Sequence, residues 1–342
     1  MEEAFCKYPE TRQFDHFRKS YLKGQPELHT LEFHGTIKIH GANISIIFTS
    51  PNSWQIQSRH RILSAEEDLY GCYATLNHAP LQELAEQILQ LESKSSNKEG
   101  EWRDIMVVGE WAGKGIQARV GVSEIEKKFL TIFNIRIGWK WQDIRRFRTV
   151  ALPSHRIFNI CDFPTYSIKI DLSNLKDIER ADQEMQNLVE QIDKKCPLAA
   201  QLGVIGHGEG IVYTYYPAEA TGTLYNFKVK GPSHQIVRKP KFWKVDAGTI
   251  HSVAVFVEYA VTDVRLDQGI TYLEEMNIPV SPESTGKYIR WVVDDVLKEE
   301  SYRMEEMGLK VKDIKAELSK TVRNGWVARL KVAQRMDLEK DI

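Results

Sequence analysis

Cysteine patterns that would build a disulfide framework or a zinc site are missing from this sequence of 342 residues. Its four cysteines, Cys6, Cys72, Cys161 and Cys196, lie far apart and include no CxxC pair. This spacing argues against a structural zinc site and is typical of a reducing compartment in which thiols stay free.

Long apolar runs and an excess of one charge are absent as well. No uninterrupted apolar stretch approaches the roughly 18 residues of a membrane-spanning helix. The N-terminal stretch MEEAFCKYPE is acidic and polar, unlike a secretory signal or a transit peptide. Lysine plus arginine (46) balances aspartate plus glutamate (47), so any basic surface must be local. We expect a cytoplasmic protein, in the host cytoplasm if viral, that is monomeric and has no membrane partner.

The pattern along the chain predicts an α+β fold in two parts. Strand-like runs occur within residues 30–75 and at IMVVGEW, FLTIFNIRI, GEGIVYTYY and TLYNFKVKG. Helical spacing occurs at 80–94 and at 176–196, where Pro197 is expected to end the helix. From about residue 250 the apolar positions follow helical spacing only. We therefore expect an N-terminal domain over residues 1–243 and an all-helical domain over residues 244–342.

A lysine stands in the middle of the strand-like stretch TIKIHGANISI, where a charged side chain is costly to desolvate. Taken alone, KIHG is a weak signal, because a strand that ends in a turn explains it equally well. However, the motif is followed in order by SRHR, GEWAG, Phe133, EGIV and KVKG. This ordered set resembles that of the covalent nucleotidyltransferases, the superfamily of ligases and capping enzymes.

Each of these motifs has a chemical interpretation. The amine of Lys38 can attack the α-phosphate of ATP and hold AMP as a phosphoramidate. A free lysine, with a pKa near ~10.4, is mostly protonated at neutral pH, so we expect burial and nearby cations to favour its neutral form. Lys228 and Lys230 alternate along a strand, point to one face and can also neutralise phosphate oxygens. Gly41 is expected to let backbone amides approach phosphate.

The remaining polar and aromatic positions complete the hypothesis. Glu209 is a candidate ligand of Mg²⁺, Glu110 an acceptor for ribose hydroxyls, and Arg59 a fork for phosphate or ribose oxygens. Phe133 can stack on the purine, although core packing alone would also explain it. His40 could be a turn histidine, and its role stays open.

Longer segments resemble the RNA ligase 2 family, which includes phage double-strand RNA ligases and trypanosome RNA-editing ligases. The segments are KIHGAN, ILSAEEDLYGCY, VVGEWAGKGIQ, SVAVFVEYAVTDVR and TVRNGWVARL. The resemblance implies an adenylyltransferase domain of the ATP-grasp-like ligase type, built of antiparallel sheets with flanking helices, and a helical C-terminal domain. It also implies an ATP-dependent RNA ligase that uses Mg²⁺, or Mn²⁺, and seals 3′-hydroxyl/5′-phosphate nicks in duplex RNA.

The resemblance assigns roles residue by residue. Lys38 would be the adenylated nucleophile, backbone groups around Ile37 and Ile39 would read the adenine, and Asn43 would orient phosphate or metal-bound water. The other implied nucleotide contacts are Arg59, Glu110, Phe133, Lys228 and Lys230, with Glu209 serving the metal. Two departures stand out: Thr214 replaces a lysine frequent in the family, and SRHRIL is one residue tighter, so Arg59 and Arg61 compete for one role.

RNA would be held by basic segments that interleave aromatic residues, namely Arg136–Arg148 and Lys228–Lys244. For the first of these, a charged surface hairpin is an equally good interpretation. Resemblance to DNA ligases or capping enzymes would imply a β-rich domain after KVKG, but the pattern there is helical, which disfavours both classes. NAD-dependent ligases usually have a further module before the nucleophile, and the 37 residues before Lys38 leave little room for one. A ligase for other ends, such as single-stranded RNA or DNA/RNA hybrids, and a non-catalytic RNA-binding relative remain alternatives.

Overall fold

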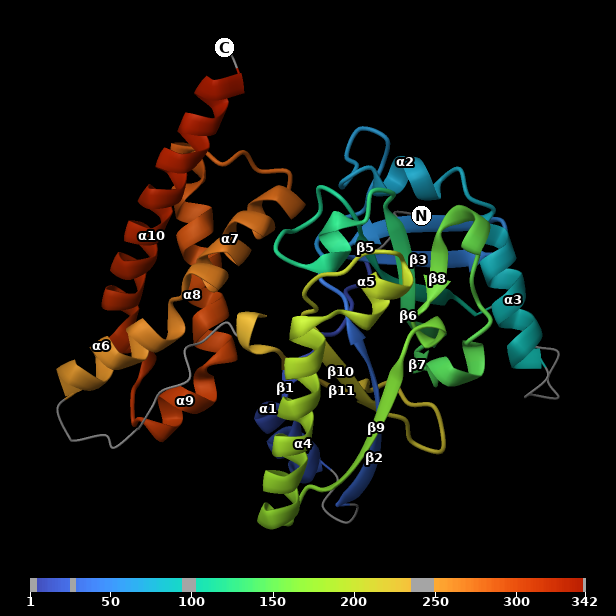
Figure 1. Ribbon diagram of the computed structural model, residues 1–342, viewed down its shortest axis with the longest axis horizontal. Coiled ribbons are helices and arrows are strands. Elements are labelled where there is room, and N and C mark those ends of the chain that lie inside the picture. The colour runs from blue at the N-terminus through green and yellow to red at the C-terminus, as the bar shows by residue number, and fades with distance from the viewer. Residues whose placement is uncertain (1–4, 25–28, 94–102, 235–248, 341–342) are drawn as a thin grey trace. The chain divides into compact units, whose positions relative to one another are not determined.

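The computed structural model describes residues 5–24, 29–93, 103–234 and 249–340. The chain forms two compact units, Met1–Ser233 and His234–Ile342 (Figure 1). The expected boundary between residues 243 and 244 lies outside the described residues. None of the helices in the described ranges combines the length and apolarity needed to cross a membrane. All four cysteines are free thiols.

One sheet of the first unit has five strands in the order β1-β11-β10-β2-β9. Its members are β1 (Arg12–Gln13), β11 (Tyr225–Lys230), β10 (Gly210–Tyr215), β2 (Thr30–Lys38) and β9 (Thr165–Asp171). Neighbours run antiparallel, except that β1 pairs in parallel with β11. The sheet therefore brings together segments from the beginning and the end of the unit.

The other sheet has the strand order β4-β3-β5-β6-β7, and β8 pairs in parallel with β6. Its members are β4 (Ser53–Ser58), β3 (Ala42–Ser50), β5 (Ile105–Ala112), β6 (Phe129–Ile137), β7 (Lys140–Trp141) and β8 (Ile157–Asn159). The pairing is otherwise antiparallel. Residues of both sheets, among them Phe33, Phe227, Ile46 and Val107, belong to one hydrophobic core, whose burial stabilises the unit.

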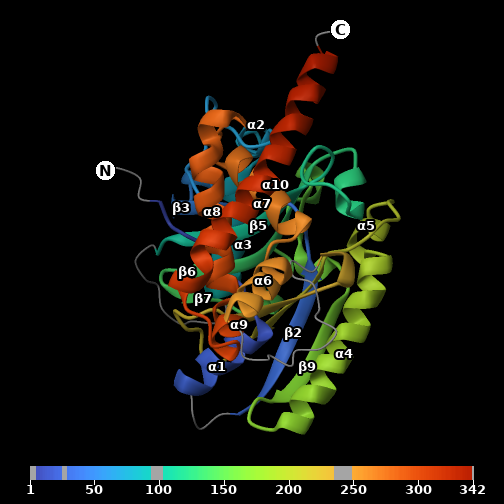
Figure 2. The ribbon, with the colours of Figure 1, turned by 90° about the vertical axis from the view of Figure 1, so that its left-hand side faces the viewer.

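Helices flank the sheets of the first unit. They are α1 (Phe14–Gly24), α2 (Cys72–Leu76), α3 (Leu81–Ser93), α4 (Leu175–Lys194) and α5 (Pro197–Gln201), with short 3₁₀ turns at Gly121–Glu124, Ile144–Phe147, Pro153–His155, Ile160–Asp162 and Pro232–His234. Helix α4 buries the stripe Ala181, Met185, Val189 and Ile192 and lies alongside β9 in both views (Figures 1 and 2). Pro197 occupies the first turn of α5, where proline needs no hydrogen-bonded N–H.

The second unit is helical throughout its described part. Its helices are α6 (Thr249–Ala260), α7 (Asp263–Glu275), α8 (Thr285–Glu299), α9 (Ser301–Glu306) and α10 (Val311–Lys340), with a 3₁₀ turn at Pro282–Ser284. A separate core includes Phe256, Val292 and Trp326. The predicted fold class, an α+β unit with antiparallel sheets followed by a helical unit, is therefore confirmed.

Candidate active site

Strand register brings the three central charged residues together. Gly210, the first residue of β10, pairs with Lys38 at the end of β2 and with Lys230 at the end of β11. Gly210 has φ +152, and a Cβ atom there would lie 2.1 Å from the carbonyl oxygen of Val229. Only glycine fits this position, so Glu209, which directly precedes it, is held between the two lysine-bearing strands.

Glu209 is the centre of a buried ionic cluster. Lys38 Nζ donates to Glu209 Oε2 at 2.7 Å, and Lys230 Nζ lies 2.7 Å from Oε1. The ring atom His40 Nδ1 is 3.1 Å from Oε2. The Glu209 side chain is 1% exposed and that of Lys230 9%, whereas the Lys38 side chain is 22% exposed. The lysine predicted to be the nucleophile is thus partly accessible, as is His40, whereas Glu209 and Lys230 are enclosed.

Charge pairing explains how a carboxylate can be buried here. Burial alone would raise the pKa of Glu209, but Lys230, Lys38 and His40 together hold that pKa well below its ordinary value. Burial lowers the pKa of Lys230, and Glu209 acts against this effect. Mutual neutralisation of this kind is the condition under which charges are tolerated in a low-dielectric interior.

Glu110 and Gly41 meet at the opposite side of the KIHG turn. Gly41 N donates to Glu110 Oε1 at 3.1 Å, and a Cβ atom at Gly41 would lie 2.3 Å from the carbonyl oxygen of Trp111. The glycine therefore allows close packing of the turn against β5, and its amide is bound to a carboxylate. The expectation that Gly41 lets backbone amides approach phosphate stays a prediction.

Asn43, Ile37 and Ile39, which flank the KIHG motif, differ in whether a side chain or only the backbone could contact a ligand. Asn43, on β3, is paired with Glu110 across the ladder, and its Oδ1 is buried without a hydrogen-bond partner. Ile37 and Ile39 are buried in the core, so only their backbone groups could contact a nucleotide, as their predicted role requires. An unsatisfied buried oxygen at Asn43 is the kind of group that a ligand completes.

Phe133 lies at an irregularity in the sheet. Val108 pairs with Asn134 and Gly109 with Ile132, so Phe133 is the extra residue of a β-bulge in β6. Bulges re-aim side chains and are common beside active sites. The ring is half-buried and packs edge-on against Tyr8, with ring centroids 5.8 Å apart.

The two arginines that follow β4 have different surroundings. Strand β4 ends at Ser58, earlier than the strand-like stretch WQIQSRHRIL suggests, because a turn returns the chain so that Ile62 pairs with Gln57. Arg61 donates to the carbonyl oxygens of Glu67 and Asp68 and so ties the turn to the loop that follows it. Arg59 lies near enough to Tyr8 to act on the pKa of its phenol.

Sequence patterns did not predict that Tyr8 lies next to Phe133, one of the candidate site residues. Its ring contacts both Phe133 and Trp141, yet more than a hundred residues separate it from either in the chain. No local periodicity signals such a contact. Gln117, in the quoted segment VVGEWAGKGIQ, is a second omission, because its Nε2 lies 3.5 Å from the carbonyl oxygen of Gly41.

The strand positions of Lys228 and Thr214 are defined by the sheet pairing. Lys228 stands on β11, two residues before Lys230, and Val229 between them is buried in the core. Thr214 is buried on β10, paired with His34 and Asn226. Within the described ranges, no group of three or more His, Cys, Asp or Glu side chains could hold a metal by itself.

Of the two basic segments, the first is mostly visible. Arg136 is half-buried and donates to Cys6 Sγ at 3.1 Å, whereas Trp139, Arg145, Arg146 and Arg148 are exposed. The first segment thus has both an inward-facing and a solvent-facing part. In the second segment, residues 235–244 lie outside the described residues.

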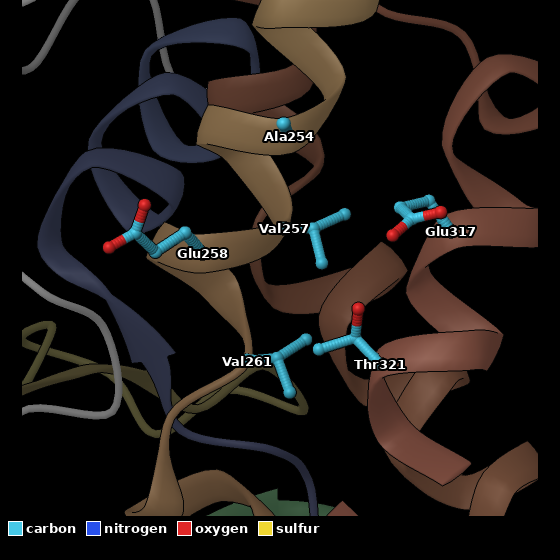
Figure 3. Close-up of a pocket in the computed structure, with 6 residues that line it drawn as sticks. All are labelled: Ala254, Val257, Glu258, Val261, Glu317 and Thr321. Atoms are coloured by element: carbon cyan, nitrogen blue, oxygen red, sulfur yellow. The ribbon is translucent and has the colours of Figure 1, made fainter. Parts of the chain in front are cut away.

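A pocket of about 280 Å³ occurs in the second unit, and its lining comes from α6, from Val261 directly after it, and from α10 (Figure 3). Val257 and Val261 form an apolar wall, and the carboxylate of Glu258 points away from the other side chains shown. None of the predicted site residues lines this pocket.

Comparisons with known proteins bear on these residues. The family model for RNA ligase matches residues 31–230, a range that contains every predicted site residue. No curated protein matches the chain. A mutant of the RNA ligase from Naegleria gruberi with AMP and Mn is similar at 12% identity and a TM-score of 0.43, covering 68% of this chain and 58% of that one. The same ligase with PPi gives 12% identity, a TM-score of 0.42 and the same coverage.

This chain thus spans 58% of the length of that ligase. The family match covers more than half of the chain, from the second strand to the KVKG motif. The resemblance that the motifs indicated is confirmed at this level: the chain belongs to the RNA ligase family.

Proposed function

We propose that the protein is an ATP-dependent RNA ligase that seals 3′-hydroxyl/5′-phosphate nicks in duplex RNA through a lysyl-AMP intermediate. The observation that supports this best is the accessible amine of Lys38, 2.7 Å from the enclosed carboxylate of Glu209. Lys230 binds the other carboxylate oxygen. Lys38 lies within the range matched by the RNA ligase family model. Its contact with Glu209 fixes the position of an accessible amine, which suits a nucleophile.

In the first step, Lys38 Nζ attacks the α-phosphorus of ATP. The ammonium first gives one proton to solvent, the N–P bond then forms as the P–O bond to pyrophosphate breaks, the electron pair leaves with pyrophosphate, and the nitrogen releases its second proton to solvent. The contact with Glu209 orients the amine, and the ammonium of Lys230 offsets negative charge that develops on the phosphate oxygens. AMP then passes to the RNA 5′-phosphate, and the 3′-hydroxyl displaces it to seal the strand.

A divalent cation fits this site only as a companion of the nucleotide. Glu209 supplies one carboxylate, and the unpartnered Oδ1 of Asn43 is a second oxygen of the type that hard cations prefer. Most ligands would therefore come from phosphate and water. Bound Mg²⁺ or Mn²⁺ would polarise the phosphoryl group and favour the departure of pyrophosphate.

Covalent labelling tests the nucleophile. The protein is incubated with ATP carrying a labelled α-phosphate and Mg²⁺, denatured and separated by electrophoresis. We expect the wild type and Lys169→Ala, which lacks an exposed lysine on β9, to be labelled, and Lys38→Ala to be unlabelled. Equal label on Lys38→Ala, or none on the wild type, would refute the assignment.

The preferred nucleic-acid substrate is tested by comparing the rates at which different strand ends are sealed. Labelled strands with 5′-phosphates are supplied as nicked duplex RNA, nicked duplex DNA, an RNA–DNA hybrid and single-stranded RNA. We expect nicked duplex RNA to be sealed fastest, because an A-form duplex is recognised by its shape and 2′-hydroxyls. Faster sealing of single-stranded RNA would favour the alternative ligase, and labelling without any sealing would leave only an adenylyltransferase.

A further inference from the structure

The N-terminal segment Phe5–Gln13, here named the N-terminal strap, connects the two sheets of the first unit. At one end, Cys6 N donates to Gln57 Oε1 at 3.1 Å and Gln57 Nε2 donates to the Cys6 carbonyl oxygen, which fixes the strap to β4. At the other end, β1 pairs with β11, the strand that carries Lys228 and Lys230. The strap therefore spans from one sheet to the other.

Tyr8 lies in the middle of the strap and is 6% exposed. Its ring packs edge-on against Trp141 at 5.6 Å and against Phe133 at 5.8 Å, and its hydroxyl accepts a hydrogen bond from Asn134 Nδ2 at 2.7 Å. Burial raises the pKa of this phenol well above its ordinary value, while Asn134, Asn226 and Arg59 act in the opposite direction. Tyr8 is thus enclosed by residues of both sheets.

These contacts concern the bulge at which Phe133 is placed. Asn134, the residue after the bulge, is tied to the Tyr8 hydroxyl, and the ring of Phe133 is supported by the Tyr8 ring. Phe133 is itself only half-buried, so part of its ring stays accessible to a ligand. Without Tyr8, a bulged aromatic side chain would be free to change rotamer.

We propose that Tyr8 is a positioning residue for the nucleotide base: it holds the bulged Phe133 in the orientation that stacks on adenine. The inference rests on the proposed function and extends it to a segment that lies outside the matched range of residues 31–230. Tyr8 acts through Phe133, so it affects how tightly ATP binds and leaves the chemical step at Lys38 unchanged.

The size of the effect follows from aromatic pairing. An edge-to-face pair contributes about 0.5–1.5 kcal/mol beyond area burial, which corresponds to about a 2- to 12-fold change in an equilibrium constant at 1.36 kcal/mol per tenfold. We therefore expect Tyr8→Leu to raise the ATP concentration for half-maximal self-labelling by about 3- to 10-fold. The maximal labelling rate should stay within about twofold of the wild type.

The experiment measures single-turnover self-labelling over a range of ATP concentrations for the full chain and three variants. Tyr8→Phe keeps the ring and should stay closer to the wild type than Tyr8→Leu. Tyr21→Leu is the matched control, because Tyr21 is also buried but packs on Phe17 of α1 and on Tyr225, away from Phe133. It should lower the melting temperature without changing the half-saturating ATP concentration.

A second measurement separates base positioning from a general structural effect. The labelled proteins are treated with pyrophosphate, which reverses the reaction and has no base. The half-saturating pyrophosphate concentration should be the same for Tyr8→Leu and the wild type. If Tyr8→Leu does not fold, Tyr8→His, which keeps a smaller ring, takes its place in both measurements.

Three results would overturn the inference. They are an unchanged half-saturating ATP concentration in the Tyr8 variant, an equal rise in Tyr21→Leu, and an equal rise for pyrophosphate. In each case a labelled wild type leaves the proposed function intact. An unlabelled wild type would instead refute the proposed function, and the role of Tyr8 with it.

Discussion

At the scale of single residues, Glu209 makes ionic contacts with three different side chains. One carboxylate, 1% exposed, contacts Lys38, Lys230 and His40. Each lysine contributes to its low pKa, and the carboxylate in turn keeps the two cations close to the position where phosphate would bind. The same contacts that stabilise the folded chain therefore position the predicted nucleophile.

The stability contributed by Glu209 should depend on pH. Its folded pKa lies below the ordinary value of 4.5, so its contribution is complete above that value and is lost as the pH falls through the folded pKa. Glu209→Gln should lower the free energy of unfolding at pH 7 by on the order of 3 kcal/mol, because two cations lose their partner. Denaturant unfolding between pH 3 and pH 7 measures this.

The control is an exposed pair. Glu126 contacts Lys114 with both side chains more than half exposed, so Glu126→Gln should change the free energy of unfolding far less than Glu209→Gln does. If wild type and Glu209→Gln lost stability equally below the ordinary pKa, the carboxylate would not have the depressed pKa described above.

Lys230 should matter for chemistry as well as for folding, because it is one of the cations that allow Glu209 to stay buried and charged. Removal of its charge leaves phosphate oxygens uncompensated, so Lys230→Ala should slow self-labelling about 100-fold or more. Lys230→Arg restores the charge and should recover part of the rate. Quench-flow measurement of labelling at saturating ATP gives the rates, and an unaltered rate in a folded Lys230→Ala protein would exclude a role in the first step.

At the scale of elements, the first residue of β10 decides where Glu209 lies. Gly210 pairs with both lysine-bearing strands and has no room for a Cβ atom. Because the strand cannot begin here with any other residue without a shift, the backbone of β10 and the ionic cluster are coupled.

Gly210→Ala should therefore displace Glu209 and abolish labelling. The backbone strain alone should cost about 1–3 kcal/mol, and the contact with Val229 adds to it. Gly203→Ala is a matched control, since Gly203 also has positive φ but no atom lies within 4 Å of its would-be Cβ. It should lose about 1 kcal/mol and keep its labelling rate. Normal labelling in Gly210→Ala would show that the strand start tolerates displacement.

Local pattern predicted most elements but not their irregularities. Alternation and helical spacing located the strands around Lys38 and Lys230 and helix α4, because burial on one face imposes those periods. The bulge at Phe133 and the early end of β4 at Ser58 depend on pairing with distant strands, which local pattern does not encode. The close approach of Gly41 to Trp111, which also requires glycine, comes from another strand and could not be predicted from local pattern.

At the scale of the whole molecule, the described residues form three hydrophobic clusters, two in the first unit and one in the second. In the second unit, the fully buried Arg265 pairs with Glu300 at 2.8 Å and with Asp295 at 3.1 Å. The candidate active site is contained in the first unit. Stability of the second unit should therefore be separable from the labelling reaction.

Arg265→Ala should destabilise the second unit by about 3 kcal/mol, because it removes a fully buried side chain from the core and leaves two half-buried carboxylates without their cation. Calorimetry should then show one unfolding transition at lower temperature and one unchanged, and self-labelling should persist between them. A shift of both transitions together would mean that the units unfold as one.

The candidate site residues could be predicted together because the motifs that contain them follow one another in a recognisable order along the sequence. What the order did not reveal is which residues touch. Tyr8 has no motif of its own, and its proximity to Phe133 follows only from the path of the N-terminal strap between two sheets.

The parallel pairing of β1 with β11 also bears on how the chain is made. Arg12 is partnered with Phe227 and Gln13 with Lys228, so the first strand must wait for more than two hundred further residues before its ladder can form. Contacts of such separation are slow to form because a long loop must close first. On the ribosome, the five-stranded sheet can close only after β11 has left the exit tunnel, so the ionic cluster forms only after nearly all residues of the first unit have been synthesised.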